Sequence, residues 1–184
     1  MTQIDIFDSC ESDIYTSYGN RLFHCSVIGA NQVRNLASGA MSRPIWVQVL
    51  FEFLCFYVAL TSEYGLCESS VGRKDRVVDK FAGMLLPAAV DYVFEDNDHD
   101  GNEKFKADFA KMLAARQAEY AKFQRVLPLD GDDKLKRTAL GAFCAKVSET
   151  ASEPNDAACM MAVHSHIHDS LKVLGMDTFA ALAG

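Results

Sequence analysis

The chain has 184 residues, of which 49% are hydrophobic and 23% are charged, a balance that excludes the polar, highly charged class of disordered proteins. Its 18 Lys and Arg against 25 Asp and Glu give a formal net charge of −7. Because an acidic chain is not drawn to phosphate backbones or anionic lipid, we expect neither nucleic acid nor a membrane as its partner.

The N-terminal part of the chain favours helix. Between residues 12 and 28, apolar residues recur at steps of three and four, which is the spacing of one helix face. We expect a first helix there. Residues 31–41 either continue this helix or form a short second one, because Gly29, Ser38 and Gly39 weaken any boundary.

A very apolar helix is predicted from about residue 42 to residue 63. Ser42 is a good N-cap residue, and Pro44 suits the first turn, where its missing N–H costs nothing. At about 100° per residue, the polar and small side chains fall in one narrow stripe, and the rest of the helix surface is apolar or aromatic. A helix with so wide an apolar face is usually surrounded by other helices or takes part in a subunit interface. We therefore expect it at the centre of the fold.

Within this helix, the apolar run from Pro44 to Leu60 has 17 residues and contains Gln48 and Glu52. It is slightly short for a bilayer, and a central carboxylate is costly in lipid, so a buried core helix is expected rather than a membrane span. A carboxyl in apolar surroundings can serve in acid–base catalysis. We expect Glu52 instead to meet solvent, or to pair with Gln48 or with a cation from another helix.

The rest of the chain predicts further helices and no sheet, because sustained apolar/polar alternation is missing. Pro87 lies inside one helical pattern and predicts a bent helix rather than two, and Gly175 is expected to end the last long helix. The sequence thus predicts one all-α domain over residues 1–184, a bundle of about five to seven helices without a linker. The later expected ranges are 77–92, 102–126, about 135–147, 154–174 and a short tail helix at 177–183.

The cysteines and the first residues indicate the compartment. Six cysteines are scattered along the chain without a CxxC pair, which is typical of reduced thiols rather than of a disulfide framework. The first residues are acidic and lack the basic and apolar regions of a secretory signal. We expect the protein in the cytoplasm.

An acidic segment resembles part of a calcium loop. Asp96, Asp98 and Asp100 occupy the first, third and fifth positions of the EF-hand pattern. The twelfth position, which should supply a bidentate Glu, is Ala107, so Ca²⁺ would be held weakly. The alternative is a turn in which Asp100 caps the next helix and Glu103 completes a capping box. We favour the turn and keep Ca²⁺ as the weaker hypothesis.

The segment from His164 to Asp169 holds three of the five histidines. On a helix, His164 and His168 are one turn apart on the same side, whereas His166 and Asp169 point elsewhere. Such a pair can begin a zinc or iron site, although no HExxH or ExxH spacing accompanies it. His164 and His168 are therefore the candidate ligands of a transition metal, and the missing further ligands are the main objection.

The common motifs for phosphate binding and for activated nucleophiles are absent from the sequence, so we do not expect an enzyme. The leading hypothesis is a small helical binding or regulatory module. It would contact a protein partner or a second copy of itself through Trp46, Phe53 and Tyr57. One alternative is a metal-dependent enzyme or sensor that uses His164 and His168. Another is a protein that binds an apolar small molecule between aromatic-rich helices.

Overall fold

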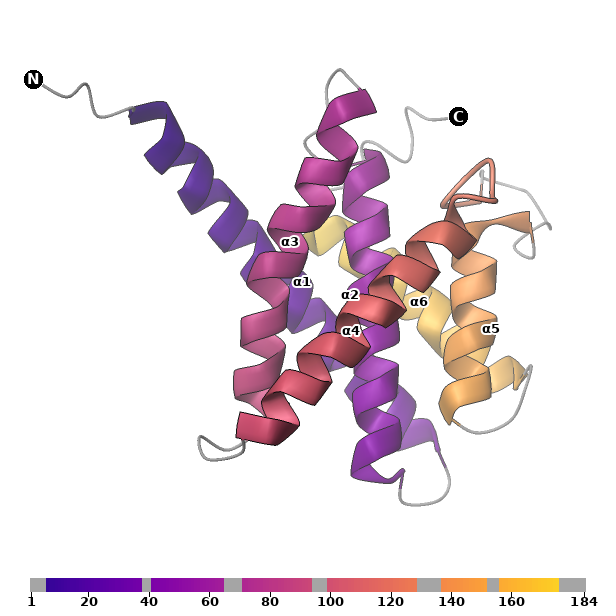
Figure 1. Cartoon of the computed structure of the whole chain (residues 1–184). Coiled ribbons are helices and arrows are strands. Elements are labelled where there is room, and N and C mark those ends of the chain that lie inside the picture. Colours follow the sequence, from indigo (N-terminus) through magenta and orange to yellow (C-terminus); the bar gives the residue numbers. More distant parts are fainter. Residues whose placement is uncertain are drawn as a thin grey trace, which may run out of the picture.

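Six α-helices make up the part of the chain that the computed structural model describes, and no strand occurs in that part (Figure 1). The described residues are 6–37, 41–64, 71–93, 99–128, 137–151 and 156–175. This architecture confirms the prediction of an all-α fold. In chain order the helices are α1 Ile6–Leu36, α2 Arg43–Tyr64, α3 Val71–Val93, α4 His99–Tyr120, α5 Ala139–Ala151 and α6 Ala157–Val173.

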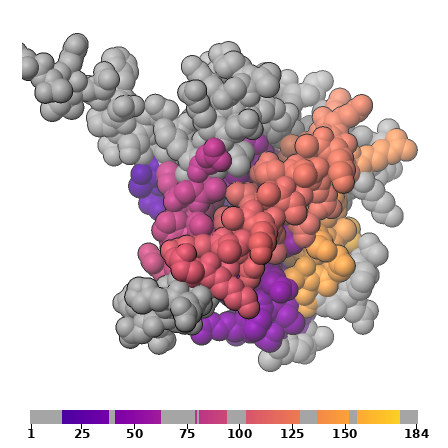
Figure 2. Space-filling model, in the orientation of Figure 1, coloured from indigo at the N-terminus to yellow at the C-terminus, as the bar shows by residue number. Residues whose placement is uncertain are grey.

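α2 is the central helix of the bundle. It packs against α1, α3, α4 and α5, and every residue from Phe51 to Ser62 is buried. α4 crosses the front of the molecule and hides much of α2 (Figure 2). By length and composition the Arg43–Ser62 segment could cross a membrane, but 78% of it is buried inside the fold. Its apolar character is therefore explained by burial among the other helices, as expected for a core helix.

The three residues expected to form an intermolecular interface belong to the core. Phe53 and Tyr57 are fully buried, and Trp46 is 8% exposed. The Phe53 ring packs edge-on against Phe143 of α5, with 5.1 Å between ring centroids, and the Trp46 indole donates a hydrogen bond to Asn31 of α1 at 3.1 Å. The surface that these residues were expected to offer to a partner is covered by helices of the same chain.

α1 runs without interruption through Gly29, where the sequence left a boundary open. A glycine occupies this position for a steric reason. A Cβ atom at this position would lie 2.5 Å from Cε1 of Phe53 and 2.7 Å from Cδ2 of His166, both far inside normal contact. Gly29 therefore lets α1 approach α2 and α6 closely, which is a frequent use of glycine inside an element.

Two predicted features of helix geometry are confirmed. α3 is one helix that contains Pro87, not two separate helices. α6 ends at Val173 with Leu174 as its C-cap, and Gly175 follows with a φ of 69°. This is the left-handed conformation that glycine adopts without strain after a helix end. The tail helix expected at 177–183 lies outside the described residues.

Other helix boundaries differ from the sequence prediction. α4 ends at Tyr120 rather than near residue 126, and residues 121–128 form turns. The carbonyl oxygens of Arg125 and Val126 accept hydrogen bonds from the first two amides of α5, at 3.1 and 2.9 Å. The turn therefore satisfies donors that a helix N-terminus leaves open. α6 starts after Asp156, whose carboxylate accepts hydrogen bonds from two backbone amides as an N-cap.

Candidate functional site

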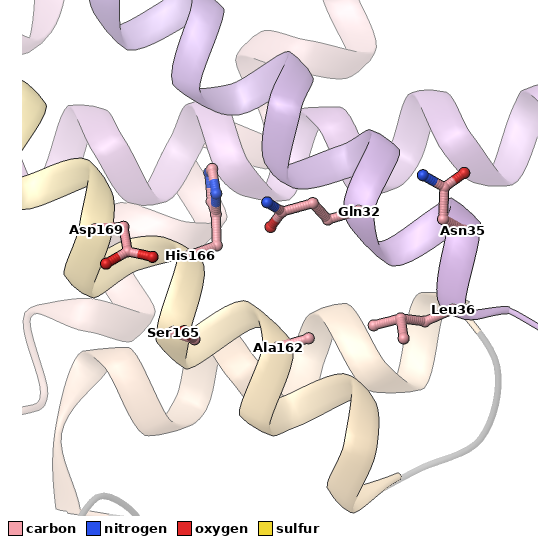
Figure 3. Close-up of a pocket in the computed structure, with 7 residues that line it drawn as sticks. All are labelled: Gln32, Asn35, Leu36, Ala162, Ser165, His166 and Asp169. Atoms are coloured by element: carbon pink, nitrogen blue, oxygen red, sulfur yellow. The ribbon is translucent and has the colours of Figure 1, made fainter.

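A pocket of about 360 Å³ opens between the C-terminal turns of α1 and the middle of α6 (Figure 3). Known small-molecule sites span roughly 300–1,000 Å³, so its volume suits a small ligand. The α6 positions that line it are spaced three and four apart and so share one side of the helix. The lining residues are Gln32, Asn35 and Leu36 of α1 and Ala162, Ser165, His166 and Asp169 of α6.

The pocket has a polar end that holds its one charged residue. Asp169 and His166 lie at the polar end, and the Gln32 amide extends toward His166 (Figure 3). At the other end lie Asn35 and Leu36, and the side chain of Leu36 points toward Ala162 (Figure 3). No Phe, Tyr or Trp side chain lines this pocket, so it differs from the aromatic-rich site that the sequence suggested.

His166 forms the inner wall of the pocket and is 7% exposed. Its Nε2 atom lies 2.8 Å from the backbone carbonyl oxygen of Cys25 on α1. A carbonyl oxygen can only accept, so this contact assigns the proton to Nε2. The Nδ1 atom of the neutral ring then carries a lone pair, and it has no hydrogen-bond partner among the described residues.

Behind the imidazole, a buried polar cluster joins α1, α2 and α6. The Tyr57 hydroxyl lies 3.2 Å and the Ser170 hydroxyl 3.3 Å from Nε2 of His166. Ser170 also lies close enough to Tyr57 and to the Cys25 thiol to oppose part of the rise that burial causes in their pKa values. The Phe53 ring packs edge-on against the imidazole, with 5.6 Å between ring centroids. These contacts hold His166 in one orientation relative to the pocket.

Burial governs the protonation of this cluster. It lowers the pKa of His166, although the hydrogen bond to Cys25 and the charge of Asp169 partly oppose the shift. It raises the pKa values of the Tyr57 hydroxyl and the Cys25 thiol. At neutral pH the imidazole is therefore uncharged and the thiol keeps its proton. A protonated thiol is a poor nucleophile, so the cluster favours binding over nucleophilic catalysis.

The structure does not gather a metal site around His164 and His168. His164 is half-buried and His168 is exposed, and the described residues contain no group of three potential ligands. The functional residue that the sequence reasoning missed is His166, which points inward as the other two do not. The helical period could have identified it. His166 follows Val163 by three residues and precedes Ser170 by four, which places it on the buried face of α6.

The calcium prediction falls mostly outside the described residues. Asp96 and Asp98 are not described, and of Asp100 only the backbone is, within α4. α4 begins at His99, one residue before the expected Asp100 cap. The hypothesis of a weak Ca²⁺ site stays a prediction.

A second polar centre lies between α2 and α4. Arg116 donates from Nε and Nη2 to the two carboxylate oxygens of Glu52, both at 2.6 Å, and from Nη1 to Glu119 at 2.8 Å. The Glu52 side chain is only 2% exposed. This ion pair matches one of the possibilities expected for Glu52, pairing with a cation from another helix. Because both charged groups are paired, we interpret this contact as a structural ion pair that holds α4 against the core.

Comparisons with models of protein families, with curated proteins and with solved structures give no match to this chain.

Proposed function

We propose that this chain is a small-molecule binding protein of the cytoplasm and that its ligand occupies the pocket between α1 and α6. The observation that carries the proposal is His166, whose Nε2 atom is held by Cys25 and Tyr57 and which also lines the pocket. A fixed polar group at the wall of a concave site provides orientation for a ligand at little entropic cost.

The chemistry of the cluster supports binding without a covalent step. The Cys25 thiol is buried and protonated, and the Tyr57 hydroxyl lies 3.2 Å from Nε2 of His166. The four described cysteines that have buried side chains are free, as expected in a reducing compartment. We favour this proposal over a protein partner on α2, because Trp46, Phe53 and Tyr57 are buried within the same chain.

A fragment screen by NMR, with a matched pair of variants, tests this proposal. Ala162→Phe fills the pocket, because Ala162 lines it, whereas Met161→Phe changes the neighbouring side chain, which is 73% exposed and lies outside the lining. We expect fragments that shift the side-chain amide signals of Gln32 and Asn35 in the wild type and in Met161→Phe. Those shifts should disappear in Ala162→Phe. Fragments that bind Ala162→Phe as well as the wild type would show that the pocket is not the site.

A further inference from the structure

We infer that the ligand of the α1–α6 pocket is a protonated amine that carries a short apolar group. The inference rests on the proposed function and names the ligand class for the same site. Three properties of the lining support it: its charge, its hydrogen-bonding capacity and the two apolar side chains, Leu36 and Ala162, that lie away from Asp169.

The charge of the lining is negative. Asp169 is its only charged residue and forms no ion pair with any described residue. Burial keeps His166 neutral by lowering its pKa, so the imidazole does not offset the carboxylate. The cations nearest in sequence on the two helices, Arg34 and Lys172, are exposed and do not line the pocket. A carboxylate or phosphate ligand would find no cation in this wall, whereas a cation finds a counter-charge.

The hydrogen-bonding groups match the same ligand. An ammonium group has three donors and no acceptor, so it needs acceptors around it. The Asp169 carboxylate is an acceptor only, and with its proton on Nε2 the lining residue His166 keeps one acceptor, Nδ1, that no described residue uses. The Gln32 amide, which extends toward His166, supplies a further carbonyl oxygen (Figure 3). The polar end of the pocket is therefore suited to one cationic head group.

Leu36 and Ala162 accommodate the rest of the molecule. Leu36 is 50% exposed, and its side chain points toward Ala162 (Figure 3). A short alkyl group of the ligand would cover both side chains and remove apolar surface from water.

Three six-carbon probes of equal length test the inference: n-hexylamine, n-hexanol and hexanoate. Each is titrated into the protein at pH 7 while the side-chain amide signals of Gln32 and Asn35 are followed by NMR. We expect n-hexylamine to bind at least roughly tenfold more tightly than the other two, since a charge-assisted hydrogen bond is worth that much. Added salt should weaken the binding of n-hexylamine, because salt screens an exposed carboxylate.

Asp169→Asn is the decisive variant, and Asp91→Asn on α3 is its control. Both residues are exposed and both changes remove one negative charge, but only Asp169 lines the pocket. Asp169→Asn should weaken n-hexylamine binding roughly tenfold, and Asp91→Asn should leave it unchanged. Thermal unfolding monitored by circular dichroism shows that both variants are folded.

The outcomes separate this inference from the proposed function. If n-hexanol or hexanoate binds the pocket as tightly as n-hexylamine, or if Asp169→Asn binds n-hexylamine as the wild type does, the amine is not the ligand class. The pocket itself then still stands as a binding site. If none of the three probes binds, the amine inference is again overturned, and the fragment screen with Ala162→Phe decides separately on the pocket.

Discussion

The guanidinium of Arg116 donates two hydrogen bonds of 2.6 Å each to the carboxylate of Glu52, which lies 64 residues earlier in the chain. The carboxylate is 2% exposed and the arginine 14%, so the pair sits at the edge of the core between α2 and α4. Hydrogen bonding to Glu52 raises the pKa of Arg116 above its ordinary value, and the guanidinium stays charged throughout the accessible pH range.

Removing one partner of this pair should destabilise the fold strongly. Arg116→Met leaves the Glu52 carboxylate buried without a counter-charge, and we expect the free energy of unfolding to fall by about 3 kcal/mol. Chemical denaturation measures the loss. Lys111→Met on the same helix is the control, because Lys111 is exposed and should change stability by less than about 0.5 kcal/mol.

A double variant distinguishes an unpaired charge from lost packing. Glu52→Leu combined with Arg116→Met removes both charges, and it should recover most of the stability that Arg116→Met loses. An unfolding free energy of the double variant at or below that of Arg116→Met would contradict this explanation.

His166 should make stability depend on pH in a defined direction. Its pKa is lowered in the fold from an ordinary value of 6.5, so below about pH 6.5 the unfolded chain binds a proton that the folded chain resists. The contribution of His166 to stability is therefore complete above pH 6.5. As the pH falls below 6.5, this contribution is progressively lost, and the loss ends once the pH is below the pKa of His166 in the folded state.

Urea denaturation between pH 7.5 and pH 5 checks this expectation. His166→Gln should flatten the dependence on pH, whereas His168→Gln should keep it, because His168 is exposed on the same helix. If the free energy of unfolding depended on pH equally in the two variants, the dependence would come from groups other than His166.

Two glycines should respond to alanine in opposite directions. Gly29→Ala drives a methyl group into Phe53 and His166, and overpacking of this kind costs about 1–3 kcal/mol. Gly83→Ala on α3 places its methyl group in open space, with no atom within 4 Å, and should stabilise the helix by up to about 1 kcal/mol. Thermal unfolding of the two variants compares them directly. A stabilised Gly29→Ala would mean that α1 does not approach α2 and α6 as closely as described.

The hydroxyl of Tyr120 should be dispensable. It is buried and has no hydrogen-bond partner among the described residues, and burial together with the charge of Glu52 raises its pKa. Tyr120→Phe removes this unsatisfied group and should raise the free energy of unfolding by roughly 1 kcal/mol. Tyr57→Phe is the matched comparison, because the Tyr57 hydroxyl contacts His166 and Ser170 and its loss should cost about 1 kcal/mol. Chemical denaturation of both variants measures whether the free energy of unfolding rises in Tyr120→Phe and falls in Tyr57→Phe.

The sequence alone was enough to predict the all-α class, the central position of α2, the continuity of α3 through Pro87 and the helix end at Gly175. Each of these depends on local properties: the period of apolar residues, the residues that cap helices, and the backbone preferences of proline and glycine. The same local reasoning placed Trp46, Phe53 and Tyr57 on a wide apolar face. It could not say whether that face meets the same chain or another one.

Only the tertiary structure decided which distant residues meet. The Nε2 atom of His166 contacts a carbonyl 141 residues earlier, and Glu52 finds its cation on a helix whose own pattern does not single out Arg116. Periodicity shows which side of a helix is buried but not which neighbour covers it, because that depends on crossing positions set by packing. Gly29 illustrates the point: it looks like a helix boundary in the sequence, and the crossing of α1 with α2 and α6 makes it a contact. The pocket, formed by two helices far apart in the chain, exists for the same reason.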